Sequence, residues 1–392
     1  MIETMRWYGP PDPVPLAYIR HAGASGVVSA LHHRPVGDAW PTDEITAYKA
    51  SIEAHGLTWD VVESIPVPQA IKTAKAGRDE AIEVFIASMR NLAANGIHTI
   101  CYNFMPVVDW TRTTLAKPMP NGALALAYDH VDFAAYDLHI LKRPGANEDY
   151  DEPVRSAAKQ RFSAMDRDEI TALENIIIAG LPGGQPGFGA REELLAKIAD
   201  FEGVTADDMC ANLIYFQEAV SAAASQVGSR ICIHPDDPPF PLFGLPRVVS
   251  TATDLDAMFS STPRHENGLT LCTGSLGANP RNDCVEIAKR FADRTHFLHL
   301  RNVATTAERT FHESDHLDGD VDVVGVIDVM LSEEKRRQTQ GRHDAEIPMR
   351  PDHGHLMMHE LTSERPSNPG YSAIGRMRGL AEVRGVSLAL AR

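Results

Sequence analysis

The chain has 392 residues, of which 43% are hydrophobic and 23% charged, with a formal net charge of −16 at pH 7. This composition supports one large or two ordinary globular domains, argues against nucleic acid as a partner and contains no apolar run long enough to span a membrane. The N-terminus, MIETMRWYGP, lacks the pattern of a secretory signal, and the five cysteines are too scattered for a disulfide framework, so we expect a cytoplasmic protein with reduced thiols.

Short apolar runs typical of buried strands alternate with longer patterns typical of helices, as in parallel α/β proteins. We expect eight strands, at residues 5–9, 26–30, 58–63, 97–101, 230–234, 269–272, 296–299 and 347–350. Helices are expected after Thr42, over residues 79–94, and from Thr205, with Asp208 in a capping box, to near Gly228. Eight strands that alternate with helices predict a closed (β/α)8 TIM barrel.

One connection is much longer than a barrel repeat requires. More than a hundred residues separate the fourth expected strand from the fifth, whereas a βα repeat needs about thirty. This stretch contains helical patterns at 166–179 and 191–199 and a Gly/Pro-rich segment, GLPGGQPGFG, at 180–189, which we interpret as a loop. We interpret residues roughly 104–204 as a helical insertion that caps the barrel mouth within a single domain of residues 1–392.

The last four expected strands end at residues with metal-binding side chains. These residues are His234, Cys272, His299 and Asp352. Active sites of TIM barrels lie at the carboxyl ends of the strands, and two imidazoles, a thiolate and a carboxylate form a ligand set for a divalent transition metal. Cys101 also ends an expected strand and is a reserve ligand, whereas Cys232 and Cys284 are expected to pack in the interior.

The segment HESDH at 312–316 matches the HExxH motif of zinc proteases, which requires a helix. It continues as LDGDVD, whose glycine and aspartates favour a loop, so we assign it to the loop after the seventh strand. There, Glu313 and His316 could contact a substrate. Two other motifs are incomplete: GLPGGQPGFG lacks the Lys-Ser/Thr of a phosphate loop, and GSLG at 274–277 is not a nucleophile elbow.

Several motifs occur in one order along nearly the whole chain: MRWYG, CYNFMPVVDWTRT, IHPDDPP, HLRN, FHESDHLDGDVD, MRPDHGH and NPGYSAIGR. Together they resemble mannonate dehydratases of the xylose-isomerase-like barrel type. The resemblance implies dehydration of D-mannonate to 2-keto-3-deoxy-D-gluconate and water in hexuronate catabolism, with Mn²⁺ or Fe²⁺ at the barrel mouth. The implied metal ligands are the same four strand-end residues that position alone selects.

The resemblance also implies roles for residues around the metal. His353 in MRPDHGH and Tyr371 in NPGYS would be the acid and the base, in an order that the sequence leaves open. Arg301 and Asn302 follow His299 and are expected to bind the carboxylate and hydroxyl groups of the substrate, because Arg binds carboxylates in a planar fork. Three residues near the ends of earlier strands are expected to line the pocket: Trp7, His33 and Asn103.

Other function classes remain as alternatives. A sugar isomerase or epimerase on the same barrel would rely on several Glu and Asp ligands, whereas this set has one carboxylate and one thiolate. A non-catalytic binding protein for a metal or a sugar acid would not explain His353, and an enolase-type dehydratase would need a carboxylate triad that binds Mg²⁺. We expect a homo-oligomer that acts on a small sugar acid, with no nucleic-acid or membrane partner.

Overall fold

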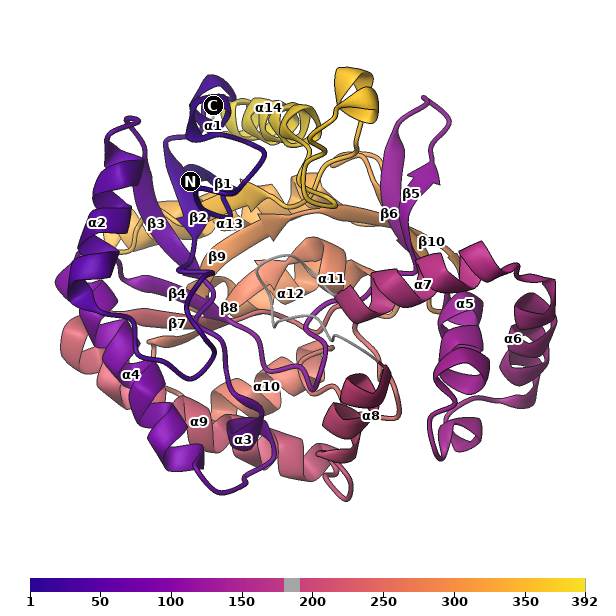
Figure 1. The fold of residues 1–392 in the computed structure, drawn as a ribbon. Helices are drawn as coiled ribbons and strands as arrows, with labels where there is room; N and C mark the ends of the chain where they lie inside the picture. Colours follow the sequence, from indigo (N-terminus) through magenta and orange to yellow (C-terminus); the bar gives the residue numbers. More distant parts are fainter. Residues whose placement is uncertain (180–190, 392) are drawn as a thin grey trace.

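The computed structural model describes residues 1–179 and 191–391. Its central element is a closed barrel of parallel strands in the order β1-β12-β9-β8-β7-β4-β3-β2, surrounded by helices (Figure 1). The strands are β1 (Ile2–Arg6), β2 (Gly26–Ser29), β3 (Thr58–Glu63), β4 (Thr99–Tyr102), β7 (Arg230–Ile233), β8 (Asn267–Cys272), β9 (Thr295–Leu300) and β12 (Pro348–Pro351). The prediction of a (β/α)8 TIM barrel is confirmed.

The first strand lies three residues earlier than expected. β1 spans Ile2–Arg6 rather than residues 5–9, and its pairing with β2 ends at Arg6 opposite Val28. The two aromatic residues that suggested a strand, Trp7 and Tyr8, therefore lie beyond it. This shift changes which side chain faces the barrel interior at the end of β1, because neighbouring strand residues point to opposite sides.

Helices cover the outside of the barrel, and their ends follow local sequence signals. Thr205 and Asp208 form the expected capping box before α9, and Gly228 ends this helix in the left-handed conformation, with φ of 65°. No described helix has the length and apolarity needed to cross a lipid bilayer. The helices outside the long insertion are α1 (Leu16–His21), α2 (Thr42–Glu53), α3 (Gln69–Lys72), α4 (Arg78–Ala94), α9 (Ala206–Val227), α10 (Ala252–Ser261), α11 (Thr273–Gly277), α12 (Cys284–Phe291), η3 (Ala292–Arg294), α13 (Val323–Thr339), η4 (Met358–Thr362) and α14 (Ala373–Leu390).

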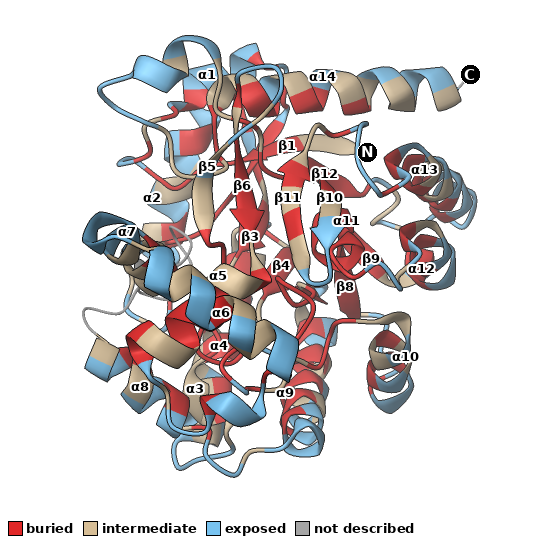
Figure 2. Cartoon of the chain, turned by 90° about the vertical axis from the view of Figure 1, so that its right-hand side faces the viewer, coloured by how far each residue is buried: buried red, intermediate tan, exposed pale blue. Residues whose placement is uncertain are grey.

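Between β4 and β7 the chain forms additional elements beside the barrel. They are β5 (Thr114–Pro118), β6 (Leu124–Tyr128), α5 (His130–Ala135), η1 (Tyr136–Leu141), η2 (Ala146–Glu148), α6 (Glu152–Ala164), α7 (Arg167–Ala179) and α8 (Arg191–Ala199). The barrel strands are buried, whereas α6 and α7 expose much of their surface (Figure 2). The helices expected at 166–179 and 191–199 are present as α7 and α8, while the segment at 180–189 lies outside the described residues.

A second sheet of four strands, which the sequence did not predict, connects this insertion to the segment after β9. Its order is β10-β11-β6-β5, and β11 (Thr310–Ser314) pairs in antiparallel fashion with both β10 (Asn302–Ala307) and β6. The first three residues of HESDH thus lie on a strand, which corrects the expectation of a loop and excludes the helix that HExxH requires. β11 thus pairs with the adjacent β10 on one side and with β6, which is distant in sequence, on the other.

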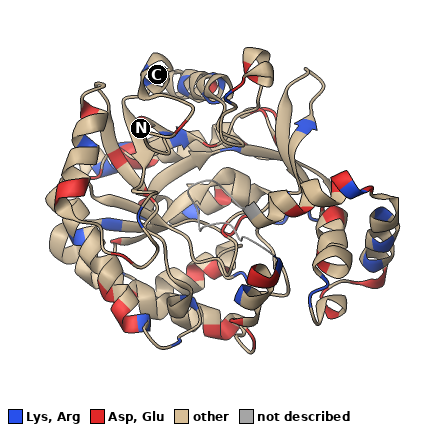
Figure 3. Ribbon diagram, viewed as in Figure 1, with Lys and Arg blue, Asp and Glu red and all other residues tan. Residues whose placement is uncertain are grey.

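The barrel interior has an apolar floor. Side chains of alternate residues point inward, and Val28, Val61, Cys101, Cys232 and Phe297 form one fully buried cluster. Residues two positions further along several of these strands carry charged or metal-binding side chains. Most other charged residues in Figure 3 are distributed over the outer helices, so the polar layer above the floor is an exception within the core.

Two glycines allow α14 to approach the segment after β12. A Cβ atom on Gly375 would lie 2.3 Å from the carbonyl oxygen of His355, and one on Gly354 would lie 2.4 Å from the carbonyl carbon of Gly375. Gly354 also donates its N–H to the carbonyl of Gly370 at 2.8 Å. The backbone contact therefore holds the segment that carries His353 beside the start of α14.

We predict that Gly375→Ala lowers the thermal unfolding temperature, because the new methyl group would meet backbone atoms, and overpacking of this kind costs about 1–3 kcal/mol. The matched control is Gly385→Ala on the same helix, where an added Cβ meets nothing within 4 Å. This control should be neutral or slightly stabilising, since alanine favours helices over glycine. Equal unfolding temperatures for Gly375→Ala and the unmodified protein would contradict the packing argument.

Candidate metal and catalytic site

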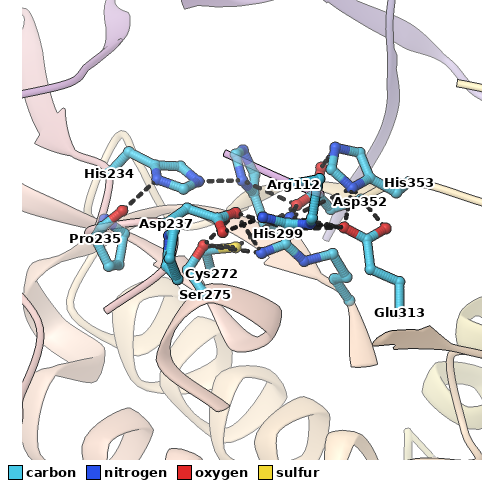
Figure 4. A network of polar contacts seen from close by, with 12 residues as sticks. Arg112, His234, Pro235, Asp237, Cys272, Ser275, His299, Glu313, Asp352 and His353 are labelled. Carbon is cyan, nitrogen blue, oxygen red and sulfur yellow. Dashed lines mark hydrogen bonds and ion pairs between the residues drawn. The ribbon is translucent and has the colours of Figure 1, made fainter. Parts of the chain in front are cut away.

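Four side chains from neighbouring strands converge at the carboxyl end of the barrel (Figure 4). The ligand atoms of His234, Cys272 and His299 all lie within 4.8 Å of one another. Asp352 joins this group through Oδ2, which lies 3.6 Å from Cys272 Sγ and 3.7 Å from His299 Nδ1. The structure thus brings together the four residues that the sequence had selected as metal ligands.

The two histidines present nitrogen atoms to one another. Nε2 of His234 lies 3.2 Å from Nδ1 of His299, while Nδ1 of His234 lies 2.6 Å from the carbonyl oxygen of Pro235 and Nε2 of His299 lies 3.4 Å from Glu63 Oε2. Because the carbonyl and the carboxylate carry negative charge, they favour the tautomers with protons on the outer nitrogens, which leave lone pairs on the facing nitrogens. A cation between them relieves the repulsion, and 3.2 Å fits two nitrogens each about 2.1 Å from one ion.

Cys272 and Asp352 also have partners on the side away from the shared centre. Ser275 Oγ lies 3.2 Å from Cys272 Sγ, to which it donates, and Arg350 pairs with Oδ1 of Asp352. Burial alone would raise the pKa of Asp352, but Arg350, His353 and Arg301 hold it well below its usual range. The Asp352 carboxylate is therefore ionised, and its second oxygen, Oδ2, lies among Cys272, His299 and Arg301, the last at 3.3 Å.

The four candidate ligands lie within a larger buried network of acidic and basic side chains. Its carboxylates and guanidinium groups belong to Glu63, Asp237, Glu313, Asp352, Arg6, Arg112, Arg301 and Arg350. Glu63 pairs with Arg6 at 2.8 Å and Arg350 at 3.0 Å, and Asp237 pairs with Arg112 at 2.7 Å and Arg301 at 2.6 Å. Burial would raise the pKa of Glu63, yet Arg350 and Arg6 keep it well below its usual range. Each carboxylate in this network thus has a cationic partner.

His353 and Tyr371 lie together beside the metal-binding group. His353 Nδ1 is 2.8 Å from both oxygens of Glu313, and the rings of His353 and Tyr371 meet edge to face with centroids 5.0 Å apart. Burial would raise the pKa of Glu313, but His353 and Arg112 lower it to about 2, so this carboxylate accepts the Nδ1 proton. Burial raises the pKa of Tyr371, whose hydroxyl is therefore protonated at neutral pH.

The other residues expected to bind substrate around β9 are already engaged by protein groups. Arg301 lies 2.6 Å from Asp237 and 3.3 Å from Asp352. The amide of Asn302 donates to the carbonyl of Val321 at 2.9 Å and accepts from its N–H at 3.0 Å, so it holds the backbone after β11. His316 lines a small cavity, with room for about one water molecule, that also touches Asp352 and His353. Burial lowers the pKa of His316 to about 4, which leaves it neutral.

The three residues near the earlier strands that were expected to line the pocket, Trp7, His33 and Asn103, lie in three different environments. Trp7 stacks on Tyr48 with ring centroids 5.4 Å apart, because β1 ends at Arg6 and places that residue, instead of Trp7, toward the interior. The His33 side chain is 61% exposed and pairs with Glu44. Asn103 follows β4 directly and is half-buried. The structure therefore does not bring Trp7 or His33 to the candidate ligands.

Several residues of this network had not been selected from the sequence. Glu63, Arg6 and Arg350 were detectable in principle, because each is a charged residue at or next to the carboxyl end of a short barrel strand. Arg112 lies between β4 and β5, where no local pattern marks it, yet it pairs with Asp237 and Glu313. The reserve ligand Cys101 lies in the apolar floor, where Thr270 donates to its sulfur at 3.2 Å.

A second group of metal-capable residues among the described residues lies at the opposite end of the barrel. It consists of His265, His296 and Asp344. The carboxylate of Asp344 lies 2.7 Å from Arg342 and 3.5 Å from Arg337. This group offers three ligands, whereas Asp352 adds a fourth to His234, Cys272 and His299 at the carboxyl ends of the strands, where active sites of TIM barrels lie.

Comparisons with known proteins agree with this geometry. The family model for D-mannonate dehydratase (UxuA) matches residues 1–392. The mannonate dehydratase of Saccharophagus degradans is 50% identical over 390 residues, covering 100% of this chain and 98% of that protein, and mannonate dehydratase 2 of Agrobacterium fabrum is 51% identical over 386 residues, covering 98% and 96%. The crystal structure of mannonate dehydratase from Streptococcus suis serotype 2 superposes with a TM-score of 0.77 at 31% identity, covering 100% of this chain and 94% of that one. The chain therefore belongs to the D-mannonate dehydratase family.

Proposed function

We propose that this chain removes water from D-mannonate to give 2-keto-3-deoxy-D-gluconate, with a divalent metal ion held by His234, Cys272, His299 and Asp352. The proposal rests on the convergence of these four donors. The atoms of His234 and Asp352 that do not face the shared centre are held by Pro235 and Arg350. Family membership supports dehydration over the alternative of an isomerase or epimerase on the same barrel.

The donor set suits a divalent transition metal, and we propose Mn²⁺ or Fe²⁺. A thiolate and two imidazoles are ligands for such ions, and a single carboxylate completes the set. When bound, the ion would stabilise the negative charge that develops on the substrate carboxylate as the neighbouring C2 proton is removed.

The charge balance of the site supports a substrate with one carboxylate. In the buried network, four carboxylates face four guanidinium groups. The thiolate of Cys272 would add one negative charge, and a divalent cation would then leave one net positive charge. A sugar acid with a single carboxylate would neutralise this charge, which favours its entry into a buried site.

His353 is the proposed base, and Tyr371 the proposed acid. Glu313 accepts the Nδ1 proton of His353, so Nε2 is left with a lone pair that can take the C2 proton. The protonated hydroxyl of Tyr371 can donate to the C3 hydroxyl as it leaves as water. These roles are supported by the contact between the two rings and by the buried environment of the phenol.

We also propose that residues roughly 104–204 cap the mouth of the barrel as part of one domain. This is supported by Arg112, which reaches from the start of the insertion to Asp237 and Glu313 at 2.7 Å each. The expected cytoplasmic location and homo-oligomeric assembly remain predictions.

The function can be tested with a panel of hexonic acids. We expect the protein loaded with Mn²⁺ or Fe²⁺ to form a 2-keto-3-deoxy acid from D-mannonate, to lose this activity after treatment with a chelator, and to regain it when metal is restored. Product can be measured by an assay for 2-keto acids. Full turnover by rigorously metal-free protein would refute the proposed metal dependence.

The ligand role of Cys272 can be tested with Cys272→Ser. A hydroxyl is a poor substitute for a thiolate, so this variant should bind Mn²⁺ at least about tenfold more weakly, as measured by calorimetric titration. Cys210→Ser is the matched control, because Cys210 is an exposed thiol and should not affect binding. Unchanged affinity in Cys272→Ser would remove Cys272 from the ligand set.

The role of His353 can be separated from metal binding with His353→Asn. We expect this variant to retain metal and to lose about 10²–10⁴-fold in turnover, the usual contribution of a general base. His33→Asn is the control, since His33 lies at the surface and its replacement should leave turnover unchanged. A near-normal rate in His353→Asn would return this residue to a structural role.

A further inference from the structure

Glu63 reaches across the barrel to the candidate ligands. It is the last residue of β3, which pairs with β2 and β4, whereas His299 and Asp352 belong to the neighbouring strand ends of β9 and β12. Its carboxylate nevertheless lies 3.4 Å from His299 Nε2. The side chain therefore extends through the barrel interior from a strand that contributes none of the four proposed ligands.

The same carboxylate contacts Asp352 indirectly. Glu63 accepts from Arg350 Nη2 at 3.0 Å and Nε at 3.2 Å, and Arg350 pairs in turn with Oδ1 of Asp352. Arg350 occupies Oδ1, and the other oxygen, Oδ2, lies near Cys272 and His299 and 3.3 Å from Arg301. One carboxylate is thus connected to two proposed ligands on two different strands.

Arg6 holds the position of Glu63 from another side. Its Nη1 lies 2.8 Å from Glu63 Oε2, and its guanidinium group lies over the ring of Tyr8 at 4.9 Å. Three strands, β1, β3 and β12, therefore fix this carboxylate. A group held in this way can orient a ligand before the metal arrives, which reduces the ordering that binding requires.

We infer that Glu63 is a positioning residue of the metal centre. Its negative charge, 3.4 Å from His299 Nε2, favours the proton on that nitrogen, so that Nδ1 presents its lone pair to the ion, and through Arg350 it orients the carboxylate of Asp352. This inference rests on the proposed metal centre. A purely structural role would be limited to compensating the charges of Arg6 and Arg350, and it would leave the coordination of the metal unchanged.

The test uses Glu63→Asp, which keeps a negative charge near Arg6 and Arg350 but withdraws it from His299. Loss of an outer partner typically weakens metal binding about 10–100-fold, so we expect the dissociation constant for Mn²⁺ to rise by at least about tenfold. The visible spectrum of the Co²⁺-loaded protein should also change, because this spectrum reports the geometry of the ligands. The thermal unfolding of the metal-free variant should stay close to that of the unmodified protein.

Glu334→Asp is the matched control. Glu334 is also buried, and its replacement by Asp removes the same methylene group. It lies at the opposite end of the barrel, where it pairs with the amino terminus at 2.8 Å and accepts from Ile347 N–H at 2.7 Å. It should leave both Mn²⁺ affinity and the Co²⁺ spectrum unchanged. If Glu63→Asp does not fold, Glu63→Gln takes its place, with weaker Mn²⁺ binding again expected.

The outcomes separate this inference from the proposed metal centre. The Glu63 variant could show the same metal affinity and Co²⁺ spectrum as the unmodified protein while Cys272→Ser binds metal more weakly. That result would overturn the role of Glu63 alone. Undiminished binding in both variants would overturn the metal centre and this inference with it. Weakened binding in both, with an altered spectrum in the Glu63 variant, supports both.

Discussion

Mutual compensation of buried charges is the constraint on which the site depends. Carboxylates and guanidinium groups at the barrel mouth are almost fully buried, and removing one partner of such a pair costs about 3–5 kcal/mol because the other charge is left unpaired. Each charged side chain is therefore held in place, because moving it would leave a buried partner unpaired. This explains how Asp352 can direct one oxygen to Arg350 and the other toward Cys272 and His299.

The parts of the site that could be predicted are those that local sequence determines. Side-chain alternation and the position of active sites at carboxyl strand ends are enough to select His234, Cys272, His299 and Asp352. For β1 the expected boundary was three residues too late: Arg6 ends the strand and Trp7 stacks on Tyr48, so a place for Trp7 in the pocket stays a prediction. A strand end is therefore informative only when its boundary is correct.

Long-range pairing could not be predicted in this way. β11 becomes a strand by pairing with β10 and with β6, and β6 lies in a connection that starts more than a hundred residues earlier. This sheet brings Glu313 and Arg112 into contact although 201 positions separate them in the chain. The function of Glu313 as the partner of His353 follows from this arrangement, and its sequence surroundings suggested only a loop.

The apolar floor of the barrel limits the route by which substrate and products reach and leave the site. Val28, Val61, Cys101, Cys232 and Phe297 have no exposed surface, and they lie directly beneath the polar layer. Neither an ionic sugar nor bulk solvent can cross such a plug at low energetic cost. The substrate must therefore enter, and both products must leave, at the carboxyl end of the barrel. The segments at that end control both substrate binding and product release.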